Sequence, residues 1–169
     1  MTTSVVDLDA WHDFYVASAG AAAALAGLII VAMTVNIGTI LKIAAMPSRA
    51  AATIGSLTLS VVVSVSSLIP EQPIWLLGAE TLVFSVGALS LAVVATRQIL
   101  QQEGAEHVSG PARFFKVAVV IAQIAPFLVG SVLLLVGVEA GLYWNAAGIV
   151  LVFIGSVLSA WILLVEILR

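Results

Sequence analysis

The sequence predicts an all-α membrane protein, a polytopic bundle of five transmembrane helices. Hydrophobic residues make up 62% of the chain, and only 9% of the residues are charged. Five apolar runs fill most of the length, and a run of about 20 apolar residues matches the roughly 30 Å hydrocarbon core of a bilayer. The basic residues fall only in alternate gaps between these runs and at the C-terminal residue.

The charge pattern predicts the orientation of the spans. The basic residues that would share one side of the membrane are Lys42, Arg49, Arg97, Arg113, Lys116 and Arg169. The other gaps carry the acidic residues Glu71 and Glu139, and the N-terminal tail carries three aspartates and no basic residue. Under the positive-inside rule the N-terminus lies outside and the C-terminus lies in the cytoplasm. The sequence therefore predicts a multi-pass protein of the cell membrane.

Residues 1–169 are expected to form a single membrane domain. Residues 1–13 are interpreted as an outer interfacial segment, because apolar side chains recur there at helical spacing. The first span, about 14–41, follows without a basic n-region, so it is interpreted as a retained helix and not a signal peptide. A turn at Met46–Ser48 precedes the second span, about 50–69, and Ser48 is a candidate helix cap.

Turn signals separate the remaining spans. Two prolines, Pro70 and Pro73, end the second span and precede the third, about 74–96. The stretch from Gly104 to Pro111 reads as the longest loop, and the fourth span covers about 114–138. Glu139 begins the last outer turn, and the fifth span covers about 142–166.

Small and polar residues form narrow stripes on three spans. Because membrane helices associate through small residues and a few hydrogen bonds, each stripe predicts close helix contact. The stripes are Gly20, Ala24, Gly27, Thr34 and Gly38 on the first span; Thr53, Ser56, Ser60, Ser64 and Ser67 on the second; and Gly141, Asn145, Gly148, Gly155, Ser159 and Glu166 on the fifth. Packing within one protomer, a hydrated path along the second-span hydroxyls, and contact with another subunit are the three interpretations.

Four further residues stand out because they are polar or helix-breaking inside a span. Glu80 is an intramembrane carboxylate, which would cost about 3 kcal/mol on insertion scales. It shares a helical face with Gly87, so we expect it to face a close neighbour, with Gln123 or the second-span serines as partners. Gln123 and Pro126 share a face of the fourth span, where the proline frees a backbone carbonyl and favours a kink.

Asn36 lies near the inner end of the first span, opposite the glycine stripe of that helix. It is expected to bond to a neighbouring helix or, in an oligomer, to line a pore. Glu80 has two interpretations of its own: an ion- or proton-binding group, or a hydrogen-bonded residue that locks helix packing near the headgroups.

The chain carries few groups that could support other chemistry. There are no cysteines, and the adjacent pair His12 and Asp13 has no metal-ligand spacing, so we expect no metal site and no cofactor. No nucleophile–base arrangement or phosphate loop is present, which predicts that the protein is not an enzyme. A net charge of -3 with no basic stripe argues against nucleic acid as a partner.

Two segments of the first span, Trp11–Val16 (WHDFYV) and Ala24–Ile37 (ALAGLIIVAMTVNI), carry a family resemblance. They resemble small bacterial, largely actinobacterial, integral membrane proteins often labelled as modulators of the FtsH protease. The resemblance implies a regulator of a membrane-bound quality-control protease, and it supplies no catalytic residue.

Two functions are therefore expected from the sequence. The first is a homo-oligomeric pore or channel-like conduit for ions or small solutes, lined by the second-span hydroxyls or the Asn36 face, with Glu80 tuning ion preference. The alternative is a non-conducting scaffold or regulator of another membrane protein. The polar stripes favour the pore. The expected partners are the lipid bilayer, further copies of the chain and another membrane protein.

Overall fold

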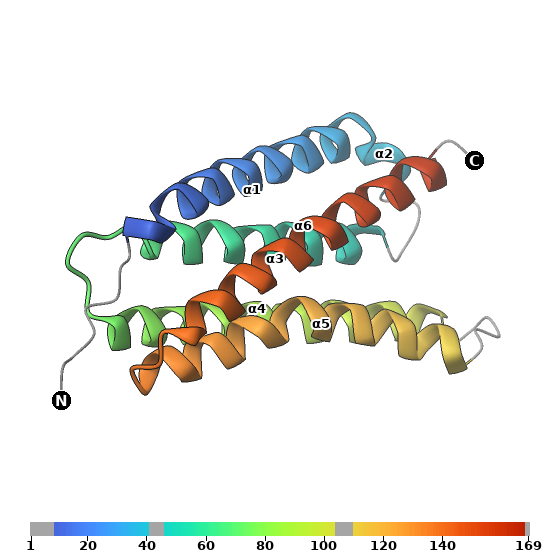
Figure 1. The fold of residues 1–169 in the computed structure, drawn as a ribbon. Coiled ribbons are helices and arrows are strands. Elements are labelled where there is room, and N and C mark those ends of the chain that lie inside the picture. The colour runs from blue at the N-terminus through green and yellow to red at the C-terminus, as the bar shows by residue number, and fades with distance from the viewer. Residues whose placement is uncertain (1–8, 41–45, 104–109, 168–169) are drawn as a thin grey trace.

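A computed structural model of the chain describes residues 9–40, 46–103 and 110–167, and all of the regular elements in these ranges are helices (Figure 1). In chain order they are α1 (Asp9–Val35), α2 (Ile37–Ile40), α3 (Met46–Ser66), α4 (Ile74–Glu103), α5 (Gly110–Leu135) and α6 (Ala140–Ile167). The all-α class predicted from the sequence is confirmed.

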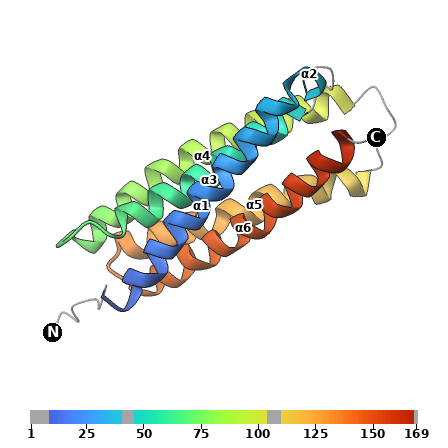
Figure 2. The same ribbon diagram turned by 90° about the horizontal axis from the view of Figure 1, so that it is seen from above.

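Four of the long helices form an antiparallel bundle, and α1 packs on its outside. Around the bundle, α3 contacts α4, α4 contacts α5, α5 contacts α6 and α6 returns to α3. The first helix lies mainly along α3 and has only a slight contact with α6 (Figures 1 and 2). Helix α3 is thus covered by neighbours on several sides, which places its hydroxyl stripe in the interior.

Three helices have the length and composition needed to cross a membrane. The qualifying stretches are Trp11–Val35, Ile74–Arg97 and Ala140–Trp161. The described apolar stretches of the other two long helices are shorter, at Ala50–Ser66 and Ile121–Leu135. By this criterion the structure gives three spans, where the sequence predicts five.

The first long helix ends earlier than the expected first span of about 14–41. Helix α1, described from Asp9 within the segment expected to carry helical spacing, ends at Val35. The Asn36 side chain explains the break, because its Nδ2 donates a 3.0 Å hydrogen bond to the Ala32 carbonyl. That carbonyl is the acceptor that the Asn36 backbone N–H would use in a continuous helix. The backbone N–H bonds instead to Met33 O at 3.2 Å, and α2 follows.

The apolar core joins α1 to the bundle through its bulky residues. Tyr15, Ala22 and Ile29 of α1 are buried, and they belong to the same cluster as Leu57 of α3 and Phe127 of α5. The spacing of the three α1 residues places them on one helical face. Gly20 and Gly27 are consequently left on the exposed face of α1.

Candidate functional site

The hydroxyl stripe of α3 lies inside the protomer. All five of its residues are buried: Thr53, Ser56, Ser60, Ser64 and Ser67. Several of these hydroxyls donate to carbonyls of their own helix, Ser56 to Thr53 O at 2.9 Å and Ser67 to Val63 O at 2.8 Å. Because the stripe faces the interior, a path along it would run through one protomer and not along an axis between copies.

Buried hydroxyl groups of α4 lie at the same depth in the bundle as part of this stripe. A Cβ added to Gly55 of α3 would lie 2.9 Å from Cδ2 of Leu91 on α4, which sets the register of the two antiparallel helices. Counting nine residues along each helix from this contact brings Ser64 to the level of Leu82, next to Thr81 in the chain. One turn further in, Ser60 lies at about the level of Ser85 by the same count. Thr81 and Ser85 are 1% and 0% exposed, so the sequence-predicted stripe is matched by a second row of hydroxyls.

Helices α5 and α6 add polar side chains at the same level of the bundle. Gly78 of α4 packs so closely on α5 that an added Cβ would lie 2.9 Å from the Ser131 carbonyl oxygen. Gly130, the residue before Ser131 in α5, lies directly against the side-chain amide of Asn145 on α6. We call Ser64, Thr81, Ser131 and Asn145, one from each bundle helix, the polar layer. All four are at most 1% exposed.

Most members of the polar layer have polar atoms without a hydrogen-bond partner in the described part of the chain. These atoms are Ser64 Oγ, Thr81 Oγ1, and the amide nitrogen and oxygen of the Asn145 side chain. Ser85 Oγ, one turn away on α4, also has no hydrogen-bond partner among the described residues. Only Ser131 is satisfied, through a 2.8 Å bond to Leu128 O. A buried polar group left unpaired costs about 1–3 kcal/mol, and such groups in proteins usually hold a water molecule or an ion.

Glu80 lies beside the polar layer, but its partner is not one of the expected residues. Its Oε2 accepts a 2.9 Å hydrogen bond from Nε2 of Gln72 in the turn between α3 and α4. Gly87, on the same helical face as Glu80, is exposed, and nothing lies within 4 Å of an added Cβ there, so the close neighbour expected for this face is not found at Gly87.

The other predicted site residues have separate positions. Gln123 of α5 packs against Gly155 of α6, and Pro126 is buried within α5, which continues as one helix across the proline. Asn36 was expected to bond to a neighbouring helix, but its amide bonds to its own helix, as described above. The structure thus places Glu80 next to Thr81 at the Gln72 end of the bundle, and Gln123, Pro126 and Asn36 have other surroundings.

The three small-residue stripes have different surroundings. The α6 stripe faces α5, with Gly141, Gly148 and Gly155 buried, while the side chain of Glu166 lies outside the described residues. The α1 stripe faces away from the bundle: Gly20 and Gly27 are exposed, and nothing lies within 4 Å of an added Cβ at either. Sequence reasoning missed Thr81, Ser85 and Gln72, although the four-residue spacing of Thr81 and Ser85 inside an apolar run was a usable signal.

The fold and the site define a class of protein: an all-helical bundle in which three helices are long and apolar enough to cross a membrane and whose interior carries a layer of polar side chains. No protein-family model, curated protein or solved structure matched the chain when each was compared with it. The function is therefore argued from the site alone.

Proposed function

We propose that the chain is a five-span protein of the cell membrane, with its N-terminus outside and its C-terminus in the cytoplasm, and that its four-helix bundle conducts protons or similarly small ions within one protomer. The observation that carries this proposal is the polar layer, together with the hydroxyls that continue it along α3 and α4. Lipid offers no hydrogen bonds, so unpaired polar groups at this position favour bound water.

The α3 stripe supplies the length of the path. From Ser67 to Thr53 the helix rises about 21 Å, which is most of the roughly 30 Å hydrocarbon core. Hydroxyl groups both donate and accept hydrogen bonds, so they support a chain of water molecules without holding a permanent charge. Glu80 stands at the Gln72 end of this path, where a carboxylate attracts cations. The tight contact at Gly130 and Gly141 favours a path narrow enough to exclude larger solutes.

The test is proton flux into liposomes that contain the purified protein and a pH-sensitive dye. The key variant combines Thr81→Val with Ser85→Ala, which removes two buried hydroxyls at nearly constant volume. The control combines Thr58→Val with Ser90→Ala, because these hydroxyls are exposed and bond to Ile54 O and Gly87 O. We expect about tenfold lower flux in the key variant, the effect of a barrier raised by one hydrogen bond. Equal flux in both variants, or wild-type flux no greater than in empty liposomes, would refute conduction.

The orientation is tested separately by labelling. The chain has no cysteine, so a single introduced thiol is a clean probe. Glu71 and Arg97 are both exposed and lie towards opposite ends of α4. A membrane-impermeant maleimide should label Glu71→Cys in intact cells, and it should label Arg97→Cys only after the membrane is opened. The reverse pattern would overturn the orientation.

A second function, regulation of another membrane protein, is favoured by the outward glycine stripe of α1. Small residues let another helix approach closely, and this stripe has no neighbour within the described protomer. It lies in the segment that resembles the modulators of the FtsH protease, and it suits self-association equally well. Chemical crosslinking in native membranes, followed by purification, tests both: the regulator interpretation requires a second protein in the adduct, and it fails if the chain is recovered only as a monomer.

A further inference from the structure

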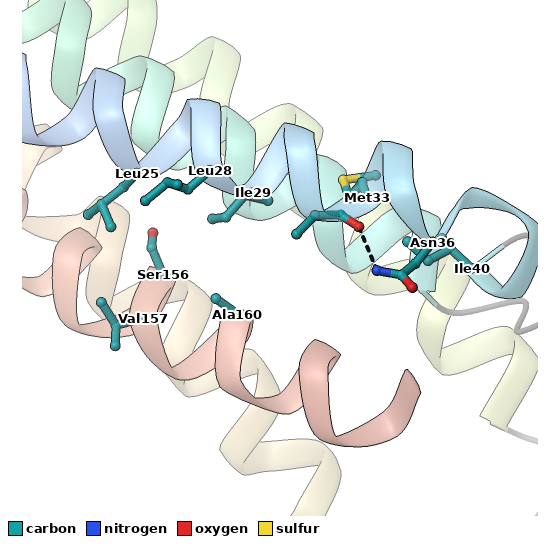
Figure 3. Close-up of a pocket in the computed structure, with 10 residues that line it drawn as sticks. Leu25, Leu28, Ile29, Met33, Asn36, Ile40, Ser156, Val157 and Ala160 are labelled. Atoms are coloured by element: carbon teal, nitrogen blue, oxygen red, sulfur yellow. Dashed lines mark hydrogen bonds between the residues drawn. The ribbon is translucent and has the colours of Figure 1, made fainter. Parts of the chain in front are cut away.

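A groove of about 330 Å³ lies between α1 and α6, away from the polar layer (Figure 3). Its walls are almost entirely apolar, and they come from two helices that each contain a stretch able to cross a membrane. The residues that define it are Leu25, Ile29 and Met33 on α1 and Asn36 directly after it, with Ser156 and Ala160 on α6. In a bilayer both walls would lie in hydrocarbon, so the groove would open towards lipid.

The groove exists because α1 and α6 are joined at one end only. Near the beginning of both helices, the ring of Trp11 packs edge-on against Tyr143, with 4.7 Å between their centroids. From there α1 follows α3 while α6 follows α5, and the two helices diverge (Figure 2). The separation is therefore a consequence of helix packing and not of a local distortion.

One polar side chain points into this apolar space. Ser156 is 1% exposed, and its hydroxyl has no hydrogen-bond partner in the described part of the chain. Figure 3 shows the hydroxyl directed from α6 towards α1. At the far end of the groove, the Asn36 amide donates to Ala32 O, which leaves its side-chain oxygen as an acceptor near the end of α1.

The dimensions of the groove select its occupant. One turn of a helix about 10 Å wide and 5.4 Å long fills about 400 Å³, so the groove is too small to enclose a helix. From Leu25 to Asn36 the helix rises about 16 Å, which matches one leaflet, half of the roughly 30 Å hydrocarbon core. A single aliphatic chain has this length and narrow section, and it suits walls without charge.

We propose that the groove is a binding site for one acyl chain of a membrane lipid, in the leaflet that contains the C-terminal end of α1. The methylene groups pack against Leu25 and Ile29, and the polar end of the lipid lies near Asn36. An occupied groove also fills the space between α1 and α6, so the lipid supports the position of α1 beside the bundle. This site does not depend on the proposed conduction.

Photocrosslinking in vesicles tests the site. The full chain is reconstituted with a phosphatidylglycerol that carries a diazirine in one acyl chain, and the adducts are mapped by mass spectrometry. The key variant is Ala160→Phe, which fills the groove. The control is Ala147→Phe, the same change at an exposed position of α6 outside the groove. We expect adducts concentrated between residues 25 and 40 and around residue 156, and about tenfold fewer in Ala160→Phe, because the ring displaces two or more buried methylenes.

Three outcomes would overturn the proposal. Adducts spread evenly over the exposed faces of all helices would show only bulk lipid. Adducts of wild-type pattern in Ala160→Phe would show that the lipid lies elsewhere. An absence of lipid adducts at these residues in the wild-type chain, with adducts on its other exposed faces, would show that something other than lipid covers the groove. Both variants are compared with wild type by melting temperature, so that loss of folding is recognised.

Discussion

Trp11 and Tyr143 meet edge-on across the interface between α1 and α6, although they lie in the first and last long helices of the chain. Trp11 also contacts the rings of Phe14 and Tyr15 on its own helix, at centroid distances of 5.9 and 6.0 Å. This aromatic cluster attaches the outer helix to the bundle at one end. The cluster therefore includes a contact between the two helices as well as contacts within α1.

The contact between Trp11 and Tyr143 predicts a measurable coupling. We expect Trp11→Ala to lower the melting temperature more than Trp75→Ala does, because Trp75 is exposed on α4 and has no ring contact among the described residues. A double-mutant cycle with Tyr143→Ala should give a coupling free energy of about 0.5–1.5 kcal/mol, the usual range for aromatic pairs. A coupling of zero would mean that α1 is held by its contacts with α3 alone.

The contact between Gly130 and Asn145 predicts a strong effect of a single methyl group. In Gly130→Ala the new Cβ would meet the Asn145 amide oxygen and lie 2.8 Å from Gly141 O, so α5 and α6 must separate. We expect a loss of about 1–3 kcal/mol in the free energy of unfolding. The matched control is Gly87→Ala, where the added methyl meets nothing within 4 Å. Equal unfolding free energies for the two variants would contradict the close crossing.

The conformation of Gly137 at the end of α5 predicts that stability depends on which residue replaces this glycine. Gly137 has a φ of 79°, and the N–H groups of Val138 and Gly137 bond to Leu133 O at 2.8 Å and Leu134 O at 3.0 Å. This pattern is a Schellman motif, in which glycine adopts the left-handed conformation without strain. Gly137→Ala should cost about 1–2 kcal/mol, and Gly137→Asn should cost less because asparagine tolerates this conformation. Thermal unfolding of both variants checks the order.

The outward stripe of α1 predicts that association and folding can be separated. Gly27 is exposed and Ala22 is fully buried on the opposite side of the same helix. Gly27→Leu should reduce crosslinked oligomers in native membranes while it leaves the melting temperature nearly unchanged. Ala22→Leu should instead lower the melting temperature, because the larger side chain must enter the contact between α1 and α3. If Gly27→Leu leaves the oligomers intact, self-association uses another surface.

The extent to which the sequence predicted the site depended on whether a residue's partner lies on its own helix. The α3 hydroxyls were found from helical spacing, because residues such as Ser60 and Ser64 share a face by geometry alone. Thr81 and Ser85, the buried hydroxyl residues of α4 at the same depth, were missed because the register between α3 and α4 is set by side-chain packing, including the contact of Gly55 with Leu91. Glu80 was correctly singled out as a polar residue with a partner, but Gln72 was overlooked since it lies in a turn.

The amino-acid sequence by itself determined the helical class and the membrane-like composition, because hydrophobicity and helical period are local properties that need no knowledge of neighbours. Which face of each helix is covered was decided only by the tertiary structure. The glycine stripe of α1 and that of α6 look alike in sequence, yet bulky residues such as Tyr15 and Ile29 turn the first stripe outward, while Gln123 and Phe127 of α5 pack against the second. The physical reason is that a helix buries the face with the most favourable contacts, and those contacts belong to its neighbours as much as to itself.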